Sequence, residues 1–127
     1  MILGLGSDIV DIGRIADAVR RHPERFARRI LTPQEWQAYQ ERDNCVNYLA
    51  KRFAAKEAVA KCFGTGLRGP LQWQTIQVLN KDLGQPHVEL LGEAMAVVAP
   101  NTVISVTLSD ERRYAIAFAV YHLTSPC

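Results

Sequence analysis

The chain has 127 residues, of which 48% are hydrophobic and 22% are charged, and its formal net charge at pH 7 is +2. This composition is ordinary for a globular protein, and the length predicts a single domain over residues 1–127. The small net charge argues against a general nucleic-acid binder, and no apolar run is long enough for a membrane span. Three scattered cysteines, Cys45, Cys62 and Cys127, form no CxxC pair, and together with the lack of a leader segment they favour a cytoplasmic protein with reduced thiols.

The first half of the chain predicts one strand followed by helices. Residues 2–12 are almost continuously apolar, which is typical of a strand buried on both faces. Helices are expected over 12–21, over 23–30 with Pro23 at the first position, from 33 onward, and from about 43 or 44 to 63. Thr32, Pro33 and Glu35 form the pattern of a capping box at the start of the third helix.

The second half of the chain predicts mainly strands. Residues 73–79 alternate like a strand, 87–91 form a second short strand, and 92–99 form a short helix. Residues 102–108 and 114–121 are expected to pair as a hairpin. Helices followed by strands indicate an α+β fold with an antiparallel sheet packed against the helices.

Glu57 is the first candidate functional residue. In the predicted helix, residues 46, 49, 50, 53 and 60 form one apolar stripe; Glu57 falls near its middle, and Lys61 lies one turn further on. A carboxylate on the buried side of a helix needs a cation, a metal ion or a proton. The alternatives are an ordinary i, i+4 ion pair on the surface and a salt bridge inside a subunit interface.

Asp8 is a second acid in apolar surroundings. With the period of two that a strand imposes, it shares a face with Ile2, Val10 and Ile12. Asp11 directly precedes a helix and is explained as its N-cap. Asp8 has no such local explanation, so it also becomes a candidate.

These two acids, with the lysine and a glycine-rich loop, suggest a magnesium site for a phosphate substrate. Mg²⁺ is typically held by one or two carboxylates while substrate phosphates complete its shell, and Asp8 and Glu57 fit that role. Lys61 could offset phosphate charge. The glycine-rich loop comprises Gly64, Thr65 and Gly66. Glycine lets the backbone approach a phosphate closely, although a loop of this kind more often simply ends a helix.

Arginines are concentrated in one part of the chain. Residues 13–31 hold six of them, at positions 14, 20, 21, 25, 28 and 29, against Asp17 and Glu24. The segment can be a solvated helix face, a surface for nucleic-acid phosphates, or a docking site for an acidic protein. Arg14 lies just past the Asp8 strand and therefore near any site built there.

Two segments resemble the signatures of holo-acyl-carrier-protein synthases. The first runs from Gly4 to Ile15 and the second from Phe53 to Lys61. The loop 64–66, the turn 84–86 and residues 105–115 also fit, so the likeness covers essentially the whole chain.

The resemblance implies a 4′-phosphopantetheinyl transferase, which moves the phosphopantetheine arm of coenzyme A onto a serine of apo-acyl carrier protein and releases adenosine 3′,5′-bisphosphate. It implies that Asp8 and Glu57 bind Mg²⁺ and act in catalysis with Lys61. It implies a homotrimer with each site between neighbouring subunits. The coenzyme A contacts it implies are Lys61, Gly64, Thr65, Gly66 and Pro86, and the carrier-protein contacts are Arg14, Arg21 and Arg25.

Two points stay open at this level. Many relatives carry histidine where this chain has Asp110, so a coenzyme contact made by a histidine there is not carried over. The group that accepts the serine proton is either Glu57 or a water on the metal.

The alternative function from another class is a non-catalytic adaptor that binds an acidic protein or RNA through its arginines and needs no metal.

Overall fold

The structure is a computed structural model that describes residues 1–124, so the prediction for Cys127 lies outside the described part. The sequence folds into β1 (Ile2–Asp11), α1 (Ile12–Arg21), α2 (Arg25–Ile30), α3 (Pro33–Glu41), α4 (Val46–Lys61), β2 (Ile76–Asn80), the 3₁₀ turn η1 (Asp82–Gly84), β3 (Pro86–Leu90), the 3₁₀ helix η2 (Gly92–Ala96), β4 (Thr102–Asp110) and β5 (Tyr114–Leu123). An antiparallel sheet has the order β1-β5-β4, and β2 pairs antiparallel with β3. The α+β prediction is confirmed.

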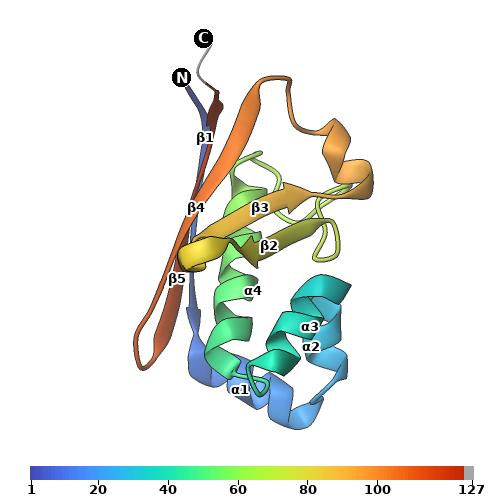
Figure 1. Cartoon of the computed structure of the whole chain (residues 1–127), viewed down its shortest axis with the longest axis vertical. Coiled ribbons are helices and arrows are strands. Elements are labelled where there is room, and N and C mark those ends of the chain that lie inside the picture. The colour runs from blue at the N-terminus through green and yellow to red at the C-terminus, as the bar shows by residue number, and fades with distance from the viewer. Residues whose placement is uncertain (125–127) are drawn as a thin grey trace.

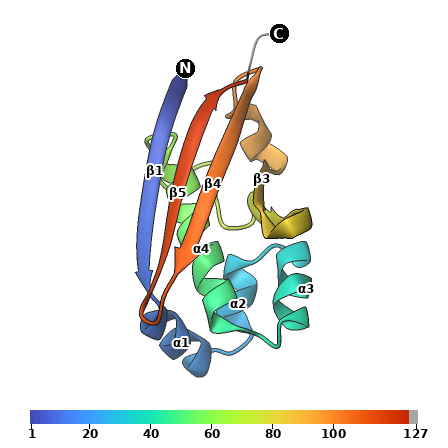
Figure 2. The ribbon, with the colours of Figure 1, turned by 60° about the vertical axis from the view of Figure 1, so that its left-hand side comes forward.

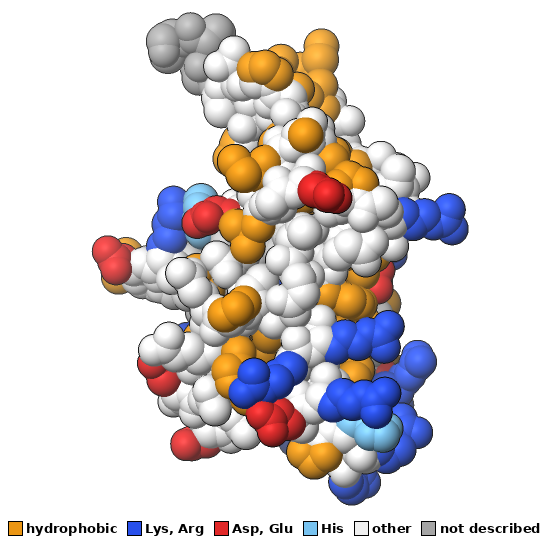
Figure 3. Space-filling model, turned by 90° about the vertical axis from the view of Figure 1, so that its right-hand side faces the viewer, with side chains coloured by type: hydrophobic (Ala, Val, Ile, Leu, Met, Phe, Trp, Pro, Cys, Tyr) orange, Lys and Arg blue, Asp and Glu red, His pale blue; other side chains and the backbone are white. Residues whose placement is uncertain are grey.

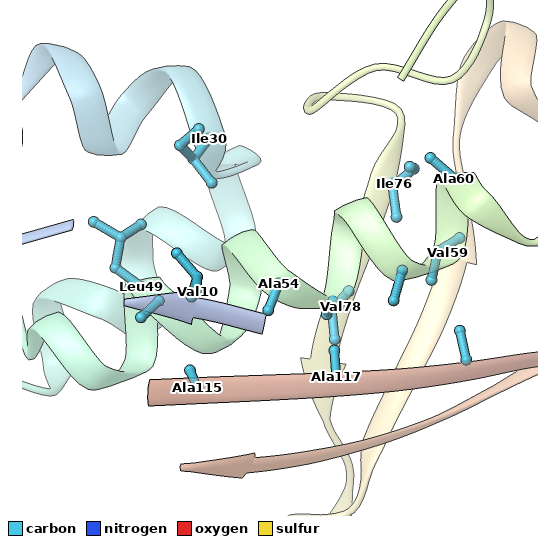
Figure 4. Close-up of a cluster of buried hydrophobic side chains, with 14 of the residues drawn as sticks. Val10, Ile30, Leu49, Ala54, Val59, Ala60, Ile76, Val78, Ala115 and Ala117 are labelled. Atoms are coloured by element: carbon cyan, nitrogen blue, oxygen red, sulfur yellow. The ribbon is translucent and has the colours of Figure 1, made fainter. Parts of the chain in front are cut away.

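Helix α4 forms the middle layer of the molecule. It lies between the three-stranded sheet and the β2–β3 pair, while α1, α2 and α3 gather at one end (Figures 1 and 2). Small side chains let α4 approach the central strand β5 closely, and Ala54, Ala115 and Ala117 among them are labelled in Figure 4. These three alanines, with Ala58 and Ala119, are fully buried. No helix within residues 1–124 is both long and apolar enough to cross a bilayer.

The predicted helix starts follow from local hydrogen bonds. Helix α1 has the predicted bounds, and the Asp11 side chain caps it by accepting a hydrogen bond from the Gly13 amide at 2.8 Å. At the start of α3, Thr32 and Glu35 form the expected capping box, in which each side chain accepts a hydrogen bond from the other residue's backbone amide.

Several boundaries differ from the prediction, and four of them illustrate the causes. Helix α2 begins at Arg25, two residues after Pro23. Helix α4 begins only at Val46, because Asp43 and Asn44 have positive φ angles of 54° and 55°. Strand β2 begins at Ile76, because residues 72–75 form a turn, and the predicted helix at 92–99 is a shorter 3₁₀ helix.

The prediction that β1 is buried on both faces is wrong. Gly4, Gly6 and Val10 face inward, and the two glycines lie directly against α4. The other face of the strand is open: Ile9 is 61% exposed, and Ile116 and Phe118, which lie on the same face of β5, are 45% and 43% exposed. Leu5, Ile9, Ile116 and Phe118 therefore make an uncovered apolar surface, which we call the outer sheet face.

A buried ion pair links the helices to β2. The Lys56 ammonium donates to Glu35 Oε1 at 2.6 Å, and both side chains are completely buried. Lys56 also donates to the carbonyl oxygens of Ile30 and Trp73, and Glu35 Oε2 accepts from the Val78 amide. All strong donors and acceptors of the pair are thus used, as burial requires. The capping-box glutamate has this second role, which the sequence did not reveal.

Candidate active site

Two glycines place Asp8 against α4. A side-chain carbon on Gly4 would lie 2.0 Å from the Cys62 carbonyl oxygen, and one on Gly6 would lie 1.9 Å from the Ala58 carbonyl oxygen. Any larger residue would separate the strand from the helix, so glycine allows direct contact between the two backbones. Asp8 follows on the same face of β1, and this contact holds it beside the last turns of α4.

Lys61 connects the strand and the helix. Its ammonium group donates to the Ser7 carbonyl oxygen at 2.9 Å and to Asp8 Oδ1 at 3.3 Å. Asp8 is mostly covered, whereas about half of the Lys61 side chain is exposed. The half-exposed lysine can therefore turn toward a bound anion, and the mostly covered Asp8 carboxylate then needs another cation in its place.

Asp8 and Glu57 share a partly buried setting. Burial raises the pKa of the Asp8 carboxyl above its ordinary value, and the Lys61 charge opposes that rise. Burial also raises the pKa of Glu57, and the negative charge of Asp8 raises it further. Two carboxylates that repel each other in partial burial are suited to a shared cation.

The carboxylate pair fits Mg²⁺ better than a softer metal. Among residues 1–124, no group of three or more His, Cys, Asp or Glu side chains is placed to hold a metal ion. Zinc normally takes at least three protein ligands, whereas Mg²⁺ keeps several waters and needs only one or two carboxylates. The sequence predicts two carboxylate ligands, Asp8 and Glu57, and this number is sufficient for Mg²⁺.

Asp8, Glu57 and Lys61 line one cavity of about 600 Å³, which we call the carboxylate cavity. The structure thus brings together the three predicted catalytic residues, which come from β1 and α4. Phe26 and Phe53 also line this cavity and give it an apolar wall. A ligand bound here would meet a charged end and an apolar side.

The predicted docking arginines lie at or near the carboxylate cavity. Arg14 and Arg21 line it, and Arg25 is exposed at the start of α2 without lining it. Lys and Arg side chains gather at the end of the molecule that carries the helices α1 to α3 (Figure 3). Asp11 and Asp17 also line the cavity, so its rim carries both signs of charge.

The other predicted coenzyme contacts lie elsewhere in the chain. Gly64 and Thr65 line a second cavity of about 470 Å³, which Gly66 does not line. Gly64 and Gly66 have positive φ angles of 78° and 68°, which explains the need for glycine at both. Pro86 lines a third cavity. Within one chain, therefore, only Lys61 of these residues joins the carboxylates.

The third cavity combines the predicted Pro86 with cationic residues that the sequence analysis did not single out, namely Arg42, Lys51 and Arg52. It measures about 530 Å³, and we call it the Arg52 pocket; its lining includes Arg42, Asn47, Lys51, Arg52, Pro86 and Asp110. Arg52 is only 2% exposed. Its Nη2 donates to Asn80 Oδ1 at 2.9 Å, but its buried Nε has no partner among the described residues. The guanidinium also stacks on the Tyr48 ring at 4.3 Å, so its charge is held at the wall of the pocket, where it favours an anion.

The carboxylate cavity and the Arg52 pocket lie on different sides of α4. Lys51 and Glu57 are six residues apart on the helix, which places their side chains about 120° apart around its axis. Lys51 faces the Arg52 pocket and Glu57 faces the carboxylate cavity. The only signal for this pocket in the sequence was Arg52 itself, an arginine within an apolar helix.

Comparison with known proteins identifies the family of the chain. The sequence model of the 4′-phosphopantetheinyl transferase superfamily matches residues 4–119. The holo-[acyl-carrier-protein] synthase of Yersinia pestis is 52% identical over 121 residues, which cover 94% of this chain and 96% of that protein.

Solved structures give the same result. The crystal structure of the holo-[acyl-carrier-protein] synthase from Neisseria meningitidis matches with a TM-score of 0.86 at 39% identity, over 96% of this chain and 99% of that one. The Helicobacter pylori synthase in complex with coenzyme A matches with a TM-score of 0.81 at 28% identity, over 93% and 99% of the two chains. The chain belongs to the 4′-phosphopantetheinyl transferase superfamily, among the holo-[acyl-carrier-protein] synthases.

Proposed function

We propose that this chain transfers 4′-phosphopantetheine from coenzyme A to a serine of apo-acyl carrier protein, with the chemistry at the carboxylate cavity. The observation that carries the proposal is the meeting of Asp8, Glu57 and Lys61 in one cavity of a chain with this family membership. Relatives of the same fold are described in complex with coenzyme A. The coenzyme is the phosphate substrate that the site requires.

Asp8 and Glu57 would hold Mg²⁺. The bound ion would offset the negative charge of the coenzyme A pyrophosphate. Lys61 would leave Asp8 for a phosphate oxygen and offset the charge that develops on the leaving adenosine bisphosphate. Transfer of a phosphoryl group asks for little covalent chemistry from the protein. Positioning of the coenzyme and of the carrier serine is therefore the main task of these residues.

The Arg52 pocket suits the remaining phosphate of the coenzyme. Coenzyme A carries a pyrophosphate and a separate 3′-phosphate, and Lys61 and the carboxylates account for the first. Arg42, Lys51 and Arg52 provide a second group of cations, and the free Arg52 Nε provides a donor. Pro86 lines the same pocket, which supports its predicted contact with the coenzyme.

The two cavities lie on different sides of α4, so we infer that one coenzyme bridges two chains. The outer sheet face supports an assembly, because an apolar surface of this kind is typical of an interface between subunits. The predicted homotrimer satisfies both requirements: each site would combine the carboxylate cavity of one chain with the Arg52 pocket of its neighbour.

The exposed arginines beside the carboxylate cavity support docking of an acidic protein. Arg14 and Arg21 line the cavity where the carrier serine would enter, and Arg25 extends the same positive surface. Acyl carrier protein, the substrate that the relatives' name states, would dock there with its acidic helix. Nucleic acid and membrane are not expected partners, and the cytoplasmic location stays a prediction.

The test is an intact-mass measurement of apo-acyl carrier protein incubated with the chain, coenzyme A and Mg²⁺. We expect the carrier protein to gain the mass of the phosphopantetheine arm, and the gain to disappear in the double variant Asp8→Asn/Glu57→Gln. Glu93→Gln removes an exposed acid outside the three cavities and should transfer normally. Transfer by the double variant would refute the site, and the adaptor alternative predicts no mass gain at all.

A further inference from the structure

Asp110 is an acid in a pocket whose other charged residues are all cations. It is the last residue of β4 and lines the Arg52 pocket together with Arg42, Lys51 and Arg52. Its side chain contacts α4 rather than capping a helix or stabilising the β4–β5 turn. An anion that enters this pocket therefore meets one negative charge among three positive charges.

Two contacts fix the Asp110 carboxylate. Asn47 Nδ2 donates to its Oδ2 at 2.8 Å, and the Lys51 ammonium lies 3.5 Å from its Oδ1. The hydrogen bond from Asn47, followed by the charge of Lys51, lowers the pKa of Asp110 below its ordinary value. Asp110 is thus charged at neutral pH.

The same contacts occupy two donors of the pocket. Asn47 and Lys51 lie one turn apart on α4, and both point at Asp110. Within residues 1–124, Arg42 and Arg52 form no ion pair: Arg42 donates to the Ala38 carbonyl oxygen, Arg52 donates to Asn80, and both stack on Tyr48. Their positive charges are therefore not neutralised by a carboxylate. A phosphate in the pocket must either do without Lys51 or displace Asp110 from it.

We propose that Asp110 is a specificity-determining residue that weakens binding of the coenzyme's 3′-phosphate by competing with it for Lys51 and Asn47. The inference rests on the proposed role of the Arg52 pocket. The released product, adenosine 3′,5′-bisphosphate, carries the same 3′-phosphate. Asp110 therefore also speeds the departure of this product, at the expense of tighter substrate binding.

The test compares the affinity of adenosine 3′,5′-bisphosphate with that of adenosine 5′-monophosphate, which lacks the 3′-phosphate. Isothermal titration would be carried out on the assembled wild-type protein and on Asp110→Asn. The amide keeps an acceptor for Asn47, so the fold is preserved. Glu93→Gln serves as the matched control, because it removes an acid of the same charge outside the pocket.

We expect Asp110→Asn to bind the bisphosphate about threefold tighter or more, as removal of one repulsive charge within several ångströms predicts. Its affinity for the monophosphate should be unchanged, and Glu93→Gln should match the wild type with both ligands. Unchanged or weaker binding of the bisphosphate by Asp110→Asn would overturn the proposal, since Asp110 would then be neutral or helpful to the phosphate.

A second variant separates this proposal from the assignment of the pocket. Arg42 is exposed, so Arg42→Met should fold normally, and it should lose most of the preference for the bisphosphate over the monophosphate. Should Arg42→Met and Arg52→Lys both keep the full preference, the 3′-phosphate binds elsewhere and the role of the pocket fails. If these variants lose the preference for the bisphosphate but Asp110→Asn binds it like the wild type, the pocket keeps its assigned role. Only the role of Asp110 is then overturned.

Discussion

Gly6 of β1 lies directly against the Ala58 carbonyl oxygen of α4, with no room for a side chain between them. This contact joins the two segments that the family signatures contain. It also explains how an acid near the start of the chain and an acid in a helix far along it come to line one cavity. The geometry of the site therefore depends on a residue that carries no functional group.

Gly6→Ala tests this dependence. The added methyl group would lie 1.9 Å from the Ala58 carbonyl oxygen, so β1 and α4 must move apart. We expect a loss of about 1–3 kcal/mol in the free energy of unfolding, measured in urea, together with a large loss of transfer activity. Ser7→Ala, which changes the neighbouring residue on the open face, is the control. Wild-type stability and activity in Gly6→Ala would contradict the close contact.

The raised pKa values of Asp8 and Glu57 predict a pH dependence of metal binding. Both lie above the ordinary values of 3.8 and 4.5, and Mg²⁺ binds the ionised forms, so protons compete with the metal. We expect the apparent Kd for Mg²⁺ to rise as the pH falls, beginning above these ordinary values. Isothermal titration at a series of pH values measures it.

The sign of the linked stability change follows from the same shifts. Without metal, the folded protein binds protons at Asp8 and Glu57 more tightly than the unfolded chain does. Acidification from neutral pH through these raised values should therefore relieve the repulsion and add stability from this pair. A Kd for Mg²⁺ that stays constant down to pH 4.5, the ordinary value for Glu57, would show that neither pKa is raised.

Reversal of charge at the docking arginines should affect one substrate only. In Arg14→Glu/Arg21→Glu, the positive surface beside the carboxylate cavity is lost, while the predicted metal and coenzyme contacts remain. We expect the KM for acyl carrier protein to rise about tenfold or more, with a smaller salt dependence, and the KM for coenzyme A to change little. Equal changes in both constants would mean that these arginines shape the cavity rather than recognise the carrier.

The outer sheet face predicts the behaviour of the assembly. Ile116→Asp or Phe118→Asp places a charge on this apolar surface. We expect sedimentation to show three associated chains for the wild type and single chains for these variants, with loss of transfer because the Arg52 pocket no longer meets a neighbour. Met95→Asp, at another exposed apolar residue, is the control. A fully active wild-type protein of single chains would refute the shared site.

Local sequence patterns predicted the parts of the fold that depend on local forces. The Asp11 cap, the capping box at Thr32 and Glu35 and the final hairpin involve residues close together in the chain, and all were confirmed. Asp8 and Glu57 were found because an acid among apolar neighbours is costly without a partner. The structure brings them into one cavity, and their role there stays a prediction.

Features that depend on distant segments escaped prediction. A continuous apolar run does not distinguish burial under helices from burial under another chain, and β1 has α4 on one face only. The periodicity of α4 did not show that Lys56 and Arg52 are more buried than Glu57, because α4 is covered on several sides by β1, β5 and β2. The Arg52 pocket forms only where the β2–β3 turn meets α4, which no local pattern encodes.

The central claim is that Asp8 and Glu57 hold one divalent ion between them. The most direct measurement is the stoichiometry of Mg²⁺ binding to the wild-type protein and to Asp8→Asn and Glu57→Gln, each compared with Glu93→Gln. The account predicts one ion per chain in the wild type and in Glu93→Gln, and a large loss of affinity in each of the two site variants while both remain folded. Wild-type affinity in Asp8→Asn and in Glu57→Gln would contradict it.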